Sequence, residues 1–198
     1  MRPLETHLKA WLVVGAWALM ASKPVGWGVE AKRLVEDARA QVGVTKGYDA
    51  SYRKLRYPEG DVPLETGVCT DVIIRALRQQ KVDLQKLVHE DMVANFSRYP
   101  KNWGAKGADS NIDHRRVPNL KTFFKRRGFA IPTGTRAEDF LPGDIVTWNL
   151  GGGIGHIGIV SDQKAPSGTP LIIHNIGSGT QEEDMLFQFP RTGHYRLR

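Results

Sequence analysis

The stretch GGGIGHIGIVSD, residues 151–162, decides the fold because it allows two incompatible structures. Its G-x-G-x-x-G spacing matches a phosphate-binding turn, but such a turn needs a strand before the glycines and a helix after them. The residues after the histidine are IGIV (157–160), and residues of this type favour a strand. We therefore expect no nucleotide site here, but a glycine turn that leads into a strand beginning with His156.

The segments around this strand show the same short-strand pattern. We expect further strands in LPGDIVTWNL (141–150), TPLIIHNIG (169–177), DMLFQF (184–189) and HYRLR (194–198). Apolar residues at helical spacing predict helices at 29–43, 70–80, 83–95 and 117–127. Helices first and short strands after predict one α+β domain, with N-terminal helices packed on a C-terminal antiparallel sheet.

The N-terminus has the features of an export signal. Arg2 and Lys9 precede the apolar run AWLVVGAWALMA (10–21), which is short for a membrane span. We expect residues 1–28 to be removed, so that residues 29–198 form the domain, contact a membrane only through the signal, and work in the periplasm or cell envelope. An uncleaved anchor or a buried helix is the alternative.

Charge indicates the kind of surface that the exported domain meets. Residues 1–28 hold three cations and one anion, so their removal lowers the formal net charge from +7 to +5. Such a balance suits a polyanionic wall or envelope surface, whereas export removes nucleic acid as a partner. The basic segment KTFFKRRG (121–128) is better explained as the end of an amphipathic helix with solvated cations. No pattern in the sequence indicates an oligomeric state.

The chain has one cysteine, Cys69, which excludes an internal disulfide. In an exported protein this residue is either a small buried apolar side chain or a thiol that is used. It stands at the start of the helix predicted for residues 70–80, where unpaired amides and the helix dipole lower the pKa of a thiol. Asp71 opposes this effect with its negative charge. Because the thiolate is the nucleophile, this location favours catalysis.

Two histidines lie on consecutive predicted strands. His174 interrupts the apolar run LIIHN, and strand alternation puts it on one face with Ile172 while Asn175 points the other way. As cross-strand neighbours, His156 and His174 could meet, one acting as base and the other orienting it. A lone histidine in a strand is usually structural, so the combination with Cys69 is what indicates a site.

Four segments together resemble a known family: GVCTDVIIRAL (67–77), LPGDIVTW (141–148), GHIGIV (155–160) and IIHNIGSG (172–179). Their order is similar to that of the motifs in NlpC-type cell-wall cysteine peptidases, which belong to the papain-like clan. Two features depart from that pattern: the nucleophile segment is Val-Cys-Thr-Asp instead of Asp-Cys-Ser-Gly, and residues 83–131 form a probable insertion.

The resemblance implies a papain-like fold with Cys69 as nucleophile, His156 as general base and His174 as the residue that orients it. It also implies Tyr57 as a tyrosine near the nucleophile. The expected activity is thiol-dependent hydrolysis of amides in peptidoglycan stem peptides, without a cofactor. The alternatives are a non-catalytic envelope-binding module and a thiol acyltransferase or transpeptidase.

The cluster Asp113-His114-Arg115-Arg116 is the best remaining candidate for substrate recognition. Arg115 and Arg116 can hold a carboxylate or phosphate in bidentate fashion, and Asp71 lies close to the nucleophile. The alternative is a helix cap with solvated arginines. Cysteine and histidine also ligate zinc, but there is no close ligand pair and no second cysteine, so we expect no metal site.

Overall fold

The computed structural model describes residues 26–197. The apolar run predicted to be an export signal lies outside these residues. The helices are α1 (Ala31–Arg39), α2 (Cys69–Gln79), α3 (Leu84–Asn95) and α4 (Val117–Arg126), with short 3-10 turns η1 (Phe96–Arg98), η2 (Asn102–Gly104), η3 (Asp113–Arg115) and η4 (Ala137–Asp139). The strands are β1 (Gly47–Tyr48), β2 (Thr66–Gly67), β3 (Ala130–Ile131), β4 (Ile145–Asn149), β5 (Gly155–Lys164), β6 (Pro170–Asn175), β7 (Thr180–Glu183) and β8 (Arg191–Tyr195).

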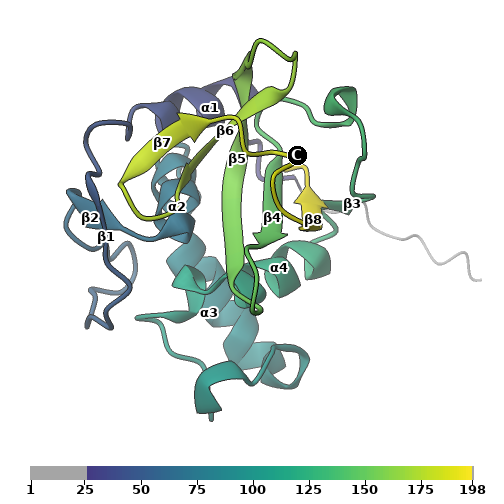
Figure 1. The fold of residues 1–198 in the computed structure, drawn as a ribbon. Helices are drawn as coiled ribbons and strands as arrows, with labels where there is room; N and C mark the ends of the chain where they lie inside the picture. The colour runs from purple at the N-terminus through teal and green to yellow at the C-terminus, as the bar shows by residue number, and fades with distance from the viewer. Residues whose placement is uncertain (1–25, 198) are drawn as a thin grey trace, which may run out of the picture.

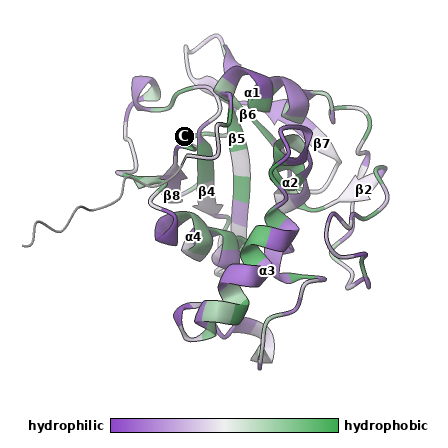
Figure 2. Ribbon diagram, turned by 180° about the vertical axis from the view of Figure 1, so that it is seen from behind, coloured by the Kyte–Doolittle hydropathy of each residue, from purple (hydrophilic) through white to green (hydrophobic). Residues whose placement is uncertain are grey.

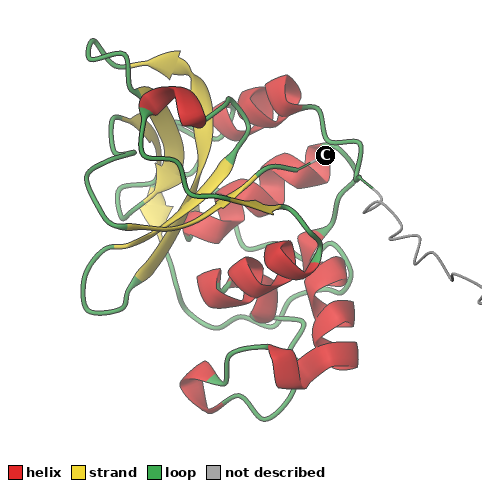
Figure 3. Ribbon diagram, turned by 90° about the vertical axis from the view of Figure 1, so that its right-hand side faces the viewer, coloured by secondary structure: helices red, strands yellow, loops and turns green. Residues whose placement is uncertain are grey.

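Six of the strands form one antiparallel sheet with the order β3-β8-β4-β5-β6-β7. The four helices lie on one side of this sheet, where α1, α2 and α4 contact the strands and α3 packs against α2 and α4 (Figure 1; Figure 3). The predicted α+β class, with N-terminal helices on a C-terminal antiparallel sheet, is therefore confirmed. Strands β1 and β2 pair in parallel outside the main sheet, next to the start of α2.

Helix α2 is the central helix of the core. Every residue from 69 to 77 is buried, because α1 packs on one side of the helix and β5 and β6 on another. Figure 2 shows α2 from the helix side, with apolar positions along its length. A helix that is covered on nearly all sides has its first turn inside the protein, and this fixes the position of Cys69.

The other face of the sheet carries a second apolar cluster, which explains why one predicted strand is wrong. Residues 184–189 form a turn instead of a strand, and the consecutive residues Met185 and Leu186 are both buried in this cluster. Consecutive burial is incompatible with strand alternation. The indole Nε1 of Trp148 donates to the Leu186 carbonyl at 3.1 Å and holds the turn against the sheet.

The basic segment at residues 121–128 ends helix α4, as predicted. Phe123 and Phe124 are fully buried, and Arg126 pairs with Asp91 at 2.7 Å. At the beginning of the described chain, the Trp27 ring packs against the same aromatic group (Phe129, 4.8 Å between centroids). Within residues 26–197, none of the helices has the length and apolarity to cross a bilayer.

Candidate active site

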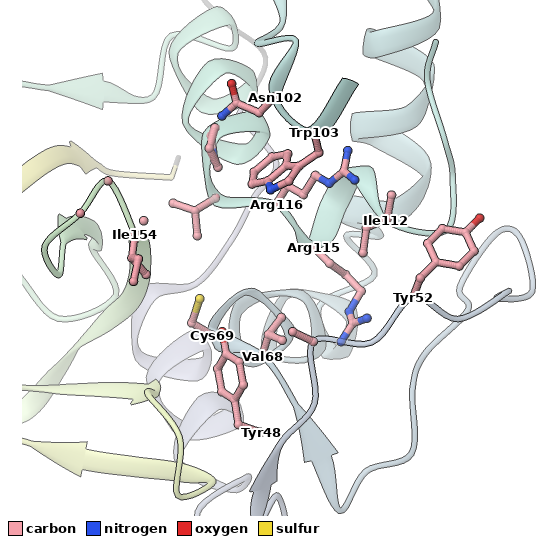
Figure 4. A pocket seen from close by; sticks show the side chains of 16 residues that line it. Tyr48, Tyr52, Val68, Cys69, Asn102, Trp103, Ile112, Arg115, Arg116 and Ile154 are labelled. Atoms are coloured by element: carbon pink, nitrogen blue, oxygen red, sulfur yellow. The ribbon is translucent and has the colours of Figure 1, made fainter. Parts of the chain in front are cut away.

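A cavity of about 550 Å³ opens above the start of α2. Its walls come from the segment around β1, from the first residues of α2, from residues 102–118 within the predicted insertion, and from the glycine turn before β5. Figure 4 shows the Cys69 sulfur pointing into this space, between Ile154 on one side and the Arg116 and Trp103 side chains on the other. The glycine turn of residues 151–153 therefore forms part of the wall, and β5, not a helix, follows it.

Cys69 is the first residue of α2, and local hydrogen bonds fix the helix start. The Asp71 carboxylate accepts from the Val68 amide at 2.7 Å, which caps the helix. The backbone amides of Ile157 and Thr70 and the Tyr48 hydroxyl lie close enough to the sulfur to lower the pKa of the thiol. All three groups favour the thiolate form of the sulfur.

Burial nevertheless dominates the acidity of this thiol. Burial raises the pKa of Cys69 to about 12, and the charge of Asp71 adds to the effect, while the three donor groups oppose it. The prediction that the helix start lowers this pKa is therefore wrong for the free protein. The physical reason is that the thiol is 4% exposed, so desolvation outweighs the helix-start amides.

His156 on β5 and His174 on β6 form a buried imidazole pair. Nε2 of His156 lies 2.9 Å from Nδ1 of His174, and the ring planes cross at 81°. Burial, together with the charge of its neighbour, lowers the pKa of His156 to about 3; burial lowers that of His174 to about 4. Both rings are therefore neutral at pH 7.

Strand register and one glycine bring the imidazole pair together. The pairing of Ile159 with Ile173 places His174 opposite Gly158, so the two histidines are diagonal neighbours. A Cβ atom on Gly158 would lie 3.1 Å from the His174 Cβ and 2.6 Å from Ile172, so only glycine leaves this space open.

The imidazole pair and the thiol approach β5 from different sides. His156 is the cross-strand partner of Trp148 and shares its face of the sheet, whereas Cys69 belongs to the helix-side core. The backbone of β5 connects them, because the amide close to the sulfur belongs to Ile157, the residue after His156. Within residues 26–197, no hydrogen bond joins the thiol to either ring.

The tyrosine beside the nucleophile is Tyr48, not Tyr57. Tyr57 packs edge-on against His89, with 5.2 Å between ring centroids, and it does not line the cavity. Tyr48 lines the cavity, and burial raises the pKa of its hydroxyl to about 12, as does the nearby Cys69 thiol. The parallel pairing of Tyr48 with Gly67 brings it there, and two-residue strands have no periodicity that a sequence pattern can detect.

Asp71 and Arg115, both predicted to bind substrate, pair with each other. The Arg115 Nη2 and Nε atoms lie 2.9 and 3.0 Å from the Asp71 carboxylate, and both side chains are buried. Arg115 also donates to the Asp49 carbonyl at 3.1 Å. This ion pair joins the start of α2 to the predicted insertion, so both residues are structural neighbours of Cys69.

Arg116 is in a different environment. It lines the cavity, and its guanidinium lies 4.6 Å from the centroid of the Trp103 ring.

No three Cys, His, Asp or Glu side chains of residues 26–197 are grouped so that they could hold a metal ion. Cys69, His156 and His174 are therefore not arranged as zinc ligands.

Comparison with known proteins places the chain among relatives. Residues 35–197 match the family described as "Domain of unknown function (DUF1287)". The chain is 60% identical over 163 residues to "Uncharacterized protein YijF" of Escherichia coli (strain K12), covering 82% of this chain and 80% of that protein.

Among solved structures, the chain is similar to NlpC2 from Trichomonas vaginalis, with a TM-score of 0.46 and 15% identity, covering 86% of this chain and 49% of the other. The corresponding values for NlpC1 from the same organism are 0.44 and 12%, covering 84% and 44%. The chain thus spans about half the length of these two proteins. Because the family model matches most of the sequence, the chain belongs to the DUF1287 family.

Proposed function

We propose that this protein is a thiol-dependent amide hydrolase, with Cys69 as nucleophile, His156 as general base and His174 as the residue that positions His156. One observation carries the proposal. The Cys69 thiol lines a cavity at the start of a buried helix, and the backbone amide close to it belongs to Ile157, the residue directly after His156 of the buried imidazole pair.

The hydrogen bond within the imidazole pair supports this division of roles. Since Nε2 of His156 faces His174, Nδ1 is the ring atom of His156 that remains to accept a proton. For that, His156 carries its hydrogen on Nε2 and donates it to Nδ1 of His174. His174 then carries its own hydrogen on Nε2, an atom that is buried without a partner among the described residues.

The pKa shifts favour proton transfer during the attack over a preformed ion pair. At pH 7 the Cys69 thiol is protonated and His156 is neutral. As the sulfur forms its bond to the amide carbon, its proton passes to His156 and then to the leaving amine when the carbon–nitrogen bond breaks. Because the His156 ring lies on the Trp148 side of β5, this transfer requires the ring to turn toward the thiol first. Water next hydrolyses the thioester and releases the thiol. The amide of Thr70, at the start of α2, is available to stabilise the negative charge that develops on the carbonyl oxygen during these steps.

The substrate that we propose is an amide of a peptidoglycan stem peptide, reached after export to the periplasm or cell envelope. The resemblance of four sequence segments to NlpC-type peptidases supports this substrate. The formal charge of +5 on residues 29–198 also supports it, because stem peptides carry free carboxylates. Because residues 102–118 of the predicted insertion form one wall of the cavity, we expect the insertion to limit which substrates can enter it.

A binding module with an inert thiol is the second candidate. The burial of Cys69, its raised pKa and the lack of a hydrogen bond from it to an imidazole within residues 26–197 favour this alternative. In such a protein, the cavity would bind wall peptides without cleaving them.

Digestion of purified peptidoglycan separates the two candidates. The wild type and Cys69→Ala are each incubated with the same preparation, and the soluble fragments are identified by mass spectrometry. We expect new amino and carboxyl termini with the wild type but not with Cys69→Ala. The control variant His89→Ala, which removes a histidine outside the cavity, should behave as the wild type. Identical fragments from the wild type and Cys69→Ala would reject wall hydrolysis.

A further inference from the structure

The two adjacent arginines at the cavity have different electrostatic partners. The charge of Arg115 is matched by Asp71 at 2.9 Å, and its remaining donors face backbone carbonyls. Within residues 26–197, the Arg116 guanidinium forms no ion pair with a carboxylate. The carboxylates of Asp109 and Asp113 are close enough for the charge of Arg116 to lower the pKa of each. For Asp113, burial dominates and raises the pKa, and its carboxylate accepts the Asp109 amide.

Stacking holds the Arg116 side chain in place. Its guanidinium lies 4.6 Å from the Trp103 ring centroid, a geometry in which a cation is attracted to the ring face. Because the ring lies beside the guanidinium carbon, N–H donors at the edge of the guanidinium remain available to a ligand. Figure 4 shows this stacked pair across the cavity from the Cys69 sulfur.

Trp103 itself has the features of a binding residue. Its side chain is 65% exposed, although large aromatic rings are usually buried. Its backbone adopts φ 58°, a left-handed conformation that is unfavourable for a bulky residue and that is enriched at functional sites. On the opposite rim of the cavity, Ile154 is 63% exposed. Two exposed apolar side chains thus flank a cation that forms no salt bridge within residues 26–197.

We propose that Arg116, held by Trp103, binds a carboxylate of the substrate. The protein would then select amides that carry a free carboxylate close to the bond that Cys69 attacks. A planar guanidinium edge forms two parallel hydrogen bonds with a carboxylate, and a neutral carboxamide does not reproduce them. This inference rests on the proposed function for the identity of the reacting amide, but carboxylate binding itself does not need the reaction.

Nuclear magnetic resonance titration tests carboxylate binding without catalysis. The Cys69→Ala protein is titrated with N-acetyl-alanine or with N-acetyl-alaninamide, while the Trp103 indole N–H and the Arg116 Nε–H signals are followed. We expect the carboxylate to shift both signals with a dissociation constant on the order of millimolar, and the amide to bind roughly tenfold more weakly.

Three substitutions in the same background identify the residues responsible. Arg116→Gln should remove the preference for the carboxylate, and Trp103→Ala should reduce it because the guanidinium is no longer held. Arg136→Gln removes an exposed arginine that pairs within its own turn, and it should leave the preference unchanged. Retained one-dimensional methyl signals of the core show that each variant is folded.

Equal binding of the carboxylate and the amide, or no shift up to about 50 mM of either compound, would overturn the inference. So would a preference that survives Arg116→Gln. The result is also independent of the proposed hydrolysis: carboxylate selectivity without any cleavage of peptidoglycan would reject the enzyme and retain the subsite, whereas cleavage without selectivity would reject the subsite alone.

Discussion

Replacing Asp71 by asparagine should lower the free energy of unfolding by about 3–5 kcal/mol, which is the usual effect of removing one partner of a buried ion pair. Asp71 accepts from Arg115 at 2.9 and 3.0 Å, and both side chains are 6% exposed or less. Asparagine keeps an acceptor for the Val68 amide, so the helix cap is retained in part. The loss therefore comes mainly from leaving the Arg115 charge buried without a counter-ion.

Urea unfolding followed by circular dichroism measures this loss. With a slope of about 2 kcal/mol per molar urea, the midpoint should fall by roughly 1.5–2.5 M. Glu138→Gln is the matched control, because its partner Arg136 has a side chain that is 67% exposed and such a pair contributes only about 0–1 kcal/mol.

The double replacement of Asp71 by leucine and Arg115 by methionine tests whether the loss comes from the unpaired buried charge. Since it removes both charges, it should recover most of the stability that the single change loses. A midpoint for Asp71→Asn within about 0.3 M of the Glu138→Gln control would show that the ion pair does not hold the start of α2 in place.

Three further predictions follow from the imidazole pair and the thiol. Gly158→Ala should lower the unfolding free energy by about 1–3 kcal/mol, because the new Cβ would lie 2.6 Å from Ile172; an unchanged urea midpoint would contradict this. The folded-state pKa values of the pair, about 3 and 4, lie below the ordinary 6.5, so the unfolded chain binds protons first as pH falls. Stability from this source is complete above pH 6.5 and declines toward pH 3, and histidine C2–H resonances of the pair that titrate near pH 6.5 would refute it. Tyr48→Phe removes a hydroxyl that lowers the Cys69 pKa, so alkylation of the thiol at pH 9 should slow about threefold; an equal or faster rate would contradict the assigned contact.

Local patterns are sufficient to predict the imidazole pair. Alternation along LIIHN places His174 on the face of Ile172, and the structure has Asn175 on the other side, where it donates to the Gly67 carbonyl at 3.1 Å. The glycine turn before His156 was also recognisable as the start of a strand, because β-branched residues follow it. Such features depend on neighbours in sequence, which is why they can be predicted.

The remaining features depend on contacts between distant segments. Tyr48 reaches the thiol through a two-residue parallel pairing with Gly67. The segment that contains Met185 forms a turn because its side chains are buried in the second apolar cluster. The direction of the Cys69 pKa shift depends on how deeply α2 is buried. Helix-start amides can be predicted from sequence, but the burial that outweighs them is a property of the assembled core.

The pH dependence of Cys69 alkylation by iodoacetamide, compared between the wild type and His156→Ala, tests the central claim most directly. A thiol with a pKa of about 12 has little thiolate at pH 7, so a reactive wild type requires proton transfer to His156. We predict a wild-type rate that levels off between pH 6 and 8 and that falls at least roughly tenfold in His156→Ala, but not in His89→Ala. Reaction only at alkaline pH, at the same rate in all three proteins, would contradict a catalytic Cys69.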